Sequence, residues 1–191
     1  MVRHCPPNAH IYLADNASTD GSVAFAEKEY PEITLIKLKV NYGFAGGYNE
    51  ALKQIDAEYF ALVNSDLEVT EGWLTPLTAI LDSDKTVASV QPKMRSYRER
   101  LKFEYAGAAG GFIDTFGYAF CRGRIFSHCE HDIGQHDDPR EVFWTTGACM
   151  VIRSSAFREA EGFDADLFAH MEEIDLCWRL KNSGHRMYCQ P

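Results

Sequence analysis

Tyr59-Phe60-Ala61-Leu62-Val63 is an apolar run that ends in the polar step Asn64-Ser65-Asp66. A short apolar run bounded by polar residues predicts a buried strand. In a sheet flanked by helices, side chains at the carboxyl end of such a strand face the crevice where nucleotides bind. A carboxylate there offers a hard oxygen ligand, so Asp66 is a candidate for metal-assisted chemistry on a phosphate. The alternative interpretation of Asp66 is a solvated turn residue.

The segments around this run alternate between expected strands and expected helices. Period-two and short apolar patterns predict strands at 9–14, 34–38, 59–63 and 87–91. Helical spacing predicts helices at 22–30, 50–55 and 73–81. This alternation predicts an α/β fold with a mostly parallel sheet.

The second half of the chain is less regular. From Arg95 to Arg140 the periodicity weakens and glycines alternate with aromatic residues, which predicts loops and short hairpins. Strand patterns return at 142–144 and 148–152, and Ser154 is expected to cap a short helix that ends at Ala160. A helix is expected at 172–182, with Gly184 as its C-terminal stop.

Length and composition exclude several classes of protein. The 191 residues fit a single domain spanning 1–191, and no apolar run reaches the roughly 20 residues of a membrane span. The first residues do not resemble a signal peptide, so we expect a cytoplasmic location. The formal charge of −9 argues against a protein that binds nucleic-acid backbones. A nucleotide held through a metal ion remains compatible with it.

The six cysteines lack a Cys-x-x-Cys pair, so we expect reduced thiols rather than a disulfide framework. A group of cysteines and histidines in the second half matches no zinc-binding pattern, and we interpret it as a polar loop: Cys121, His128, Cys129, His131 and His136.

A second acidic segment, Asp15-Asn16-Ala17-Ser18-Thr19-Asp20, follows the first expected strand. Asp15 comes directly after the strand, so its carboxylate can accept the imide N–H of a uracil or thymine ring. For Ser18, Thr19 and Asp20 we favour capping of the next helix over a functional role.

Three glycines lie in the segment Asn41-Tyr42-Gly43-Phe44-Ala45-Gly46-Gly47-Tyr48-Asn49. Glycine lets a backbone pass close to a bulky ligand, and the helix that follows would offer free N–H groups to negative charge. A turn that satisfies only local geometry is the alternative.

A third acidic group, Glu172, Glu173 and Asp175, falls in the first turn of the expected helix at 172–182. The positive end of the helix dipole is a sufficient structural reason for acids there. The functional alternative is that one carboxylate removes the proton from an acceptor hydroxyl while the others position it. At most one or two of them can serve the same pocket, because neighbouring helical residues point in different directions.

Taken in order, five motifs resemble the family 2 glycosyltransferases, most closely the bacterial rhamnosyltransferase-like branch. The motifs span residues 15–22, 41–49, 64–66, 146–150 and 172–179. The resemblance covers nearly the whole chain. It implies the GT-A fold, which is a Rossmann-like three-layer α/β sandwich, a nucleotide-diphosphate sugar donor, a divalent metal ion (Mg2+ or Mn2+) and inversion at the anomeric carbon.

The resemblance also implies roles for single residues. It makes Asp66 the last acid of a degenerate Asp-x-Asp motif and hence the metal ligand. Glu172-Glu173 takes the place of a Glu-Asp pair whose second member is the general base, which points to Glu173, with Glu172 and Asp175 as further candidates. Asp15 is expected to recognise the nucleotide base, and Asn64 is expected to form a hydrogen bond near the ribose or phosphate. The residues expected to bind the donor are Asp15, Asn41, Gly46, Gly47, Asn49 and Asn64.

Two departures from the family pattern concern the ends. The first strand–helix unit and a metal-binding histidine beyond Pro191 are missing, so we expect the chain to be a fragment of a longer protein. Because the missing strand would be central, its loss should expose backbone groups and apolar faces. Residues 1–92 would form a nucleotide-binding half and residues 93–191 an acceptor-binding half.

The resemblance therefore implies an inverting transferase that moves a sugar such as rhamnose from a UDP- or dTDP-linked donor to a glycan or lipid-linked hydroxyl acceptor. Bacterial surface polysaccharide synthesis, a homodimer and peripheral association with the inner face of the membrane are further expectations. The alternatives are a nucleotide-sugar-binding module without catalysis, and a sugar-phosphate nucleotidyltransferase, which the absence of a glycine-rich segment with a phosphate-binding Lys or Arg disfavours.

Overall fold

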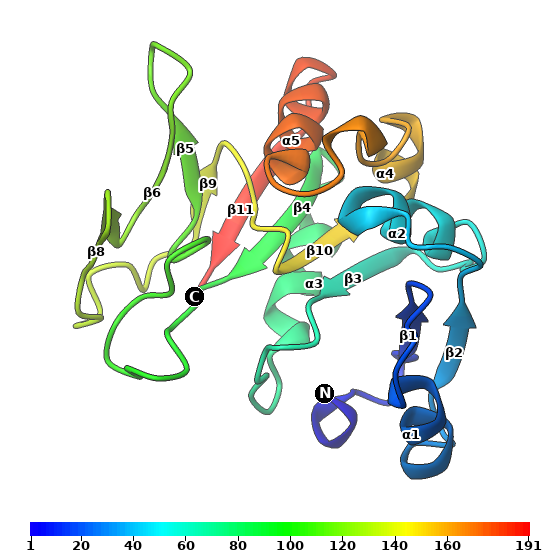
Figure 1. The fold of residues 1–191 in the computed structure, drawn as a ribbon. Helices are drawn as coiled ribbons and strands as arrows, with labels where there is room; N and C mark the ends of the chain where they lie inside the picture. The colour runs from blue at the N-terminus through cyan, green and yellow to red at the C-terminus, as the bar shows by residue number, and fades with distance from the viewer.

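A five-stranded sheet forms the centre of the computed structural model, which describes residues 1–191 (Figure 1). Its strand order is β3-β10-β4-β11-β9. The strands are β3 (Tyr59–Val63), β10 (Cys149–Arg153), β4 (Val87–Pro92), β11 (Arg186–Gln190) and β9 (Arg140–Val142).

The sheet is mixed, which corrects the expectation of a mostly parallel sheet. β4 and β11 are parallel, but β10 runs antiparallel to both β3 and β4, and β9 is antiparallel to β11. The alternation of strands and helices in the first half predicted mostly parallel strands. The difference arises because β10, from the second half of the chain, inserts between β3 and β4.

The first two strands form a separate parallel sheet. β1 (Tyr12–Asp15) pairs with β2 (Thr34–Lys37), and α1 (Ser22–Glu29) connects them. Figure 1 shows this unit next to β3 but set apart from the central sheet. An apolar cluster of Ile36, Leu38 and Ala51 attaches the unit to α2 (Gly43–Leu52).

Helices cover both faces of the central sheet. On one face, Leu77 and Leu81 of α3 (Leu74–Ser83) pack against Val90 and Val151. The opposite face, which includes Met150 and Ile152, packs in one large cluster with residues of α2, α4 (Ser154–Glu159) and α5 (Glu172–Asn182). Neighbouring residues of β10 therefore face different layers, as a pleated strand requires. No helix in the structure is long and apolar enough to cross a membrane.

Short hairpins occupy the region from Arg95 to Arg140, as expected. They consist of β5 (Gly111–Ile113) paired with β6 (Ala119–Cys121), and β7 (Arg124–Ile125) paired with β8 (His128–Cys129).

All six cysteines are free thiols. Nowhere does the structure gather three or more His, Cys, Asp or Glu side chains that could hold a metal ion.

The expected bounds match β3 and α5, and those of β2, β4, β10, α1, α3 and α4 agree to within two residues, whereas others differ more. α2 begins at Gly43 and ends at Leu52, not at 50–55, and β9 precedes the expected strand at 142–144. Ser154 is the first residue of α4 rather than its cap, and β11 was not expected. The stop at Gly184 is confirmed: Gly184 N–H donates to Lys181 O and His185 N–H to Leu180 O, both at 3.0 Å, a Schellman ending.

Candidate functional site

The end of β3 presents Asn64, Ser65 and Asp66. The Asn64 backbone N–H donates to the carbonyl of Ala148 at 2.9 Å, which continues the β3–β10 ladder by one residue. Beyond it the chain turns outward, and the side chain of Asp66 is exposed. The β10 ladder therefore fixes Asn64, while the carboxylate of Asp66 stays open to a ligand.

Asp15 occupies the corresponding position at the end of β1. Its carboxylate oxygens accept the backbone N–H of Ser18 at 3.3 and 3.2 Å, across a turn in which Ala17 has a φ of 62°. These are long bonds, and an ionised carboxylate has about four acceptor positions. Asp15 thus stabilises the turn and keeps the capacity to accept a further N–H. Asp20 accepts the N–H of Ser22, the first residue of α1, at 2.9 Å, but the cap position itself is occupied by Gly21, which has no side chain to cap the helix.

Asn16 joins β1 to the start of α2, a role that sequence reasoning missed. Its amide N–H groups donate to Asn41 Oδ1 at 3.0 Å and to Gly43 O at 2.8 Å, and its carbonyl accepts the Tyr42 N–H at 3.0 Å. Asn41 Oδ1 also accepts the Gly43 N–H at 2.9 Å. The two asparagines hold the 15–16 and 41–43 segments in a fixed relation. The position of Asn16 directly after the strand-end Asp15 was the one sequence feature that could have indicated this role.

The glycines of the 41–49 segment lie inside α2 rather than in a loop before it. The first N–H groups of this helix are not free: those of Phe44 and Ala45 donate to Phe168 O at 2.8 and 3.2 Å. A side chain on Gly43 would lie 2.6 Å from the Phe168 ring, and one on Gly47 would lie 3.0 Å from Asn16 Nδ2. The glycines therefore admit protein neighbours, and their expected contact with the donor stays a prediction.

Asn49 and Gly46 face the 162–168 segment. Asn49 donates to Phe163 O at 2.8 Å and accepts the Phe163 N–H at 3.0 Å. A Cβ on Gly46 would come within 4.0 Å of Ala165. Asn49 therefore positions the loop before α5, with its amide engaged by protein backbone, whereas the nearest neighbour of an added Cβ on Gly46 would be Tyr42 at 3.0 Å.

The N-terminal turn of α5 buries two carboxylates. Glu172 is 5% exposed, and one oxygen of Glu172 and one of Glu173 are buried with no hydrogen-bond partner. Burial raises the pKa of the Glu173 carboxyl, and the nearby Glu172 carboxylate acts in the same direction. A buried carboxyl with a raised pKa is a better proton acceptor once it is ionised.

Gly147 brings Glu173 to the β3 end. A Cβ on Gly147 would touch the Phe44 ring at 3.5 Å and Glu173 Cβ at 3.6 Å, so this glycine lies between them. Its neighbour Ala148 is the residue bonded to Asn64. A continuous series of neighbours therefore links the buried carboxylate to the end of β3: Glu173, Gly147, Ala148 and Asn64.

Asp175 is engaged elsewhere. Its Oδ2 accepts two bonds from Arg179, at 2.7 and 2.9 Å, and Arg179 donates in turn to Gly162 O at 2.8 Å and to Ala160 O. This ion pair ties α5 to the turn after α4. Asp175 therefore has a structural partner, unlike Glu172 and Glu173.

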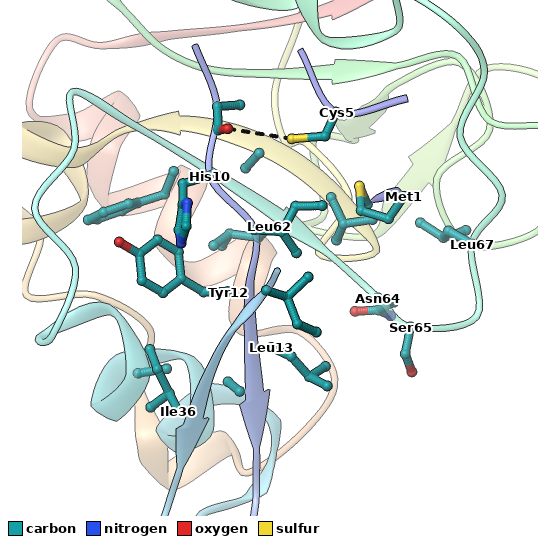
Figure 2. Close-up of a pocket in the computed structure, with 18 of the residues that line it drawn as sticks. Met1, Cys5, His10, Tyr12, Leu13, Ile36, Leu62, Asn64, Ser65 and Leu67 are labelled. Carbon is teal, nitrogen blue, oxygen red and sulfur yellow. Dashed lines mark hydrogen bonds between the residues drawn. The ribbon is translucent and has the colours of Figure 1, made fainter. Parts of the chain in front are cut away.

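A single hollow of about 2470 Å3 lies between β1 and β3 and collects part of the expected donor-binding set. Asp15, Gly47, Asn64 and Asp66 line it, together with Asn16 and Phe44. Figure 2 shows Asn64 and Ser65 on one side of the hollow and Tyr12 and Leu13 on the other. Asn41, Gly46, Asn49 and the α5 carboxylates are not among its lining residues.

The protein offers a metal ion one carboxylate at this place rather than a cage. Asp66 is exposed and its carboxylate makes no hydrogen bond or ion pair within the protein. Mg2+ and Mn2+ accept such an arrangement when phosphate and water supply the remaining oxygens. The single carboxylate ligand therefore fits a cation that binds together with a diphosphate.

The sequence model for Glycosyl transferase family 2 matches residues 2–160. Among curated proteins, N-acetylglucosaminyl-diphospho-decaprenol L-rhamnosyltransferase of Mycobacterium tuberculosis is 28% identical over 203 residues, covering 91% of this chain and 61% of the relative. The chain thus spans about three fifths of that protein's length.

Two solved structures share the fold at low sequence identity. GalNAc-T7 with UDP, GalNAc and Mn2+ superposes with a TM-score of 0.75 at 14% identity, over 100% of this chain and 38% of that one. Mannosyltransferase PcManGT from Pyrobaculum calidifontis, in complex with GDP-Man and Mn2+, gives a TM-score of 0.61 at 18% identity, over 95% and 45%. The GT-A fold expected from the sequence is confirmed.

Proposed function

The chain belongs to glycosyltransferase family 2, and on that premise we propose that it transfers a sugar from a nucleoside-diphosphate donor to an acceptor hydroxyl with inversion. The observation that carries the proposal is the placement of Asp15, Asn64 and Asp66 on one hollow, with Glu173 next to Gly147, whose neighbour Ala148 bonds to Asn64 at the end of β3. Both strand ends face that hollow.

The donor lies across the ends of β1 and β3 in this proposal. Asp15 accepts the imide N–H of the base, for which its carboxylate has acceptor positions left. Asn64 bonds near the ribose or phosphate from a backbone that β10 holds in place. Asn16 and Asn41 keep the base-binding turn aligned with α2.

A divalent cation held by Asp66 would offset the charge that develops on the diphosphate leaving group. The Asp66 carboxylate supplies one oxygen, and the support for this assignment is its exposure at the end of β3 among the residues that line the hollow. The Mn2+ in GalNAc-T7 and PcManGT belongs to those proteins, and it makes Mn2+ the first ion to test here.

Glu173 acts as the general base. Its carboxylate takes the proton of the acceptor hydroxyl while that oxygen bonds to the anomeric carbon. The bond from this carbon to the phosphate oxygen breaks, and the nucleoside diphosphate leaves with the electron pair. Glu172 is more deeply buried than Glu173, and Asp175 is paired with Arg179, so neither competes well for this role.

For the sugar we propose rhamnose, carried on UDP or dTDP, and for the acceptor a lipid-linked glycan of bacterial surface polysaccharide synthesis. The support is the similarity to the Mycobacterium tuberculosis rhamnosyltransferase, whose name specifies rhamnose and a sugar linked to a diphospho-decaprenol lipid. We extend the proposal to peripheral membrane association because a lipid-linked acceptor lies at a membrane surface, and to a homodimer.

A second candidate is a nucleotide-sugar-binding module without catalysis, which is favoured because the α5 carboxylates do not line the hollow that Asp15, Asn64 and Asp66 share. Incubation with UDP- and dTDP-linked sugars and Mn2+ separates the two. Transfer requires release of nucleoside diphosphate, and that release should disappear in Glu173→Gln and Asp66→Ala. Binding without release supports the module; no binding, or full release in both variants, contradicts the donor site itself.

A further inference from the structure

The connection between β9 and β10 crosses the central sheet and is buried. β9 is an edge strand and β10 lies between β3 and β4, so residues 143–148 must pass β11 and β4 to join them (Figure 1). Thr145 and Thr146 in this connection are 0% and 1% exposed. A buried irregular segment cannot give its backbone N–H and C=O groups to water, so other protein groups must bond to them.

Two side chains of β4 bond to this connection. Ser89 and Gln91, both fully buried, are two residues apart and therefore project from the same face of the strand. The Ser89 hydroxyl lies 2.9 Å from the hydroxyl of Thr145, which in turn lies 3.7 Å from Cys177 Sγ on α5. Gln91 Oε1 accepts the backbone N–H of Thr146 at 2.8 Å. β4 thus holds the connection against α5.

The amide of Gln91 bonds on its other side as well. Its Nε2 donates to Gly107 O and to Pro92 O, each at 3.2 Å. Gly107 lies before β5, and a Cβ on it would lie 2.7 Å from Thr146 Cβ, so this segment packs directly on the connection. One buried side chain of β4 therefore joins two backbone segments that are 16 and 55 residues away in sequence.

These bonds direct one N–H of the connection toward the proposed general base. The N–H of Thr146 bonds to Gln91, and that of Ala148 donates to Thr146 Oγ1 at 3.2 Å. Gly147 lies between them, and a Cβ on it would be 3.6 Å from Glu173 Cβ. Burial raises the pKa of the Glu173 carboxyl, and the backbone N–H of Gly147 opposes that rise. The position of the connection therefore affects the base.

The other groups that face Glu173 come from α5 and the turn before it. Besides burial, the neighbouring Glu172 carboxylate raises the pKa of Glu173, and His170 lowers it. Cys177 follows one turn further along the helix. None of the three belongs to the 143–148 connection, so a shift of the connection changes the contribution of Gly147 and leaves theirs in place.

We propose that Gln91 is a positioning residue for Glu173, because its bond to Thr146 sets the peptide that presents the Gly147 N–H to this carboxylate. The role depends on the proposed function only in that Glu173 is the base. A displacement of about 1 Å at a reacting group can cost about 100-fold in rate. Gln91 should act on turnover more than on donor binding, because the β3–β10 ladder holds the backbone of Asn64.

Gln91→Met tests this role, because methionine is of similar length but has no amide to bond Thr146 or Gly107. We expect kcat to fall by about tenfold to a hundredfold. The KM for the donor and the calorimetric affinity for UDP with Mn2+ should change by less than about twofold. Ser89→Ala is the control, since it removes a bond from the same face of β4 to the side chain of Thr145 rather than to the backbone. It should lower the urea midpoint but keep kcat within about twofold of wild type.

A pair of variants at Thr146 keeps the test open if Gln91→Met does not fold. Thr146→Val has a similar shape but lacks the Oγ1 that accepts the Ala148 N–H, whereas Thr146→Ser keeps that oxygen. The valine variant should lower kcat by about tenfold or more, and the serine variant should restore it to near the wild-type value. Equal kcat in the two variants would contradict control of the base by this connection.

The pKa of Glu173, followed by carboxyl 13C NMR, is a readout that needs no turnover. It should be higher in Gln91→Met than in the wild type, because the carboxyl stays buried while the Gly147 N–H no longer stabilises its ionised form. An unchanged pKa or an unchanged kcat in this variant would overturn the proposal, and so would an equal loss of kcat and donor affinity. If the wild type transfers no sugar but the Glu173 pKa still rises in Gln91→Met, the proposed function fails and the positioning by Gln91 stands.

Discussion

Replacing Glu173 by glutamine should abolish transfer and stabilise the fold. The amide keeps the size of the side chain but cannot accept a proton. A general base contributes about 10²–10⁴-fold, which at about 1.36 kcal/mol per tenfold corresponds to about 2.7–5.4 kcal/mol of barrier. Stability should change in the opposite direction, because one oxygen of the ionised Glu173 is buried without a partner.

The pH dependence has a defined sign. Burial raises the pKa of Glu173 in the folded protein. The carboxyl therefore favours folding while it is protonated, below the unfolded value of roughly 4.3, and that contribution is lost as the pH rises through the folded pKa. At pH 7 the glutamine variant should be more stable by about 1–3 kcal/mol, the usual cost of an unsatisfied buried group, and the difference should vanish near pH 4.

Nucleoside-diphosphate release measures the activity, and urea unfolding at pH 7 and pH 4 measures the stability. Glu172→Gln is the matched control, since it also neutralises a buried carboxylate of the same helix turn but should retain turnover. Full turnover in Glu173→Gln would refute the base assignment. Loss of both turnover and stability would show that the variant misfolds and that the reasoning about burial is wrong.

Three further predictions follow from the site. Asp15→Asn should weaken binding of UDP and dTDP by about tenfold in calorimetry, because an amide accepts the base N–H less strongly than a carboxylate; unchanged affinity would exclude Asp15 as the base reader. Gly147→Ala should slow turnover but keep the free energy of unfolding within about 1 kcal/mol of the wild-type value, because the added Cβ meets Phe44 and Glu173 at ordinary contact distances. Gly111→Ala is the contrasting variant. Its Cβ would lie 1.9 Å from Trp144, so it should lower the free energy of unfolding by about 1–3 kcal/mol. Asn49→Ala should cost about 1–3 kcal/mol in urea unfolding through its two bonds to Phe163, and an unchanged midpoint would contradict that structural role.

The local sequence pattern was sufficient to predict the bounds of elements that are determined by their own residues and the residues next to them. The apolar run of β3 and the acid-led α5 with its Gly184 stop have the bounds that the sequence predicted. α2 was misplaced because Gly43, Gly46 and Gly47 oppose a helix by about 1 kcal/mol each relative to alanine. Contacts from Phe168 and Asn16, distant in sequence, outweigh that local preference.

The same limit applies to the site. Positions at strand ends, such as Asp15 and Asp66, could be selected from sequence because strand ends converge at one edge of a sheet. Asn49 could not be recognised as a support for Phe163, 114 residues away. The mixed sheet was also beyond local reasoning, because β10 enters between β3 and β4 only in the folded chain.

The central claim is that the β1 and β3 ends bind a nucleoside diphosphate through a cation on Asp66. Calorimetric titration of UDP and dTDP, with and without Mn2+, into the wild type and Asp66→Asn tests it most directly. We predict Mn2+-dependent binding that weakens by about tenfold or more in the variant, or about 1.4 kcal/mol. Absence of binding with Mn2+, or binding of equal strength in the variant and without the ion, would contradict it.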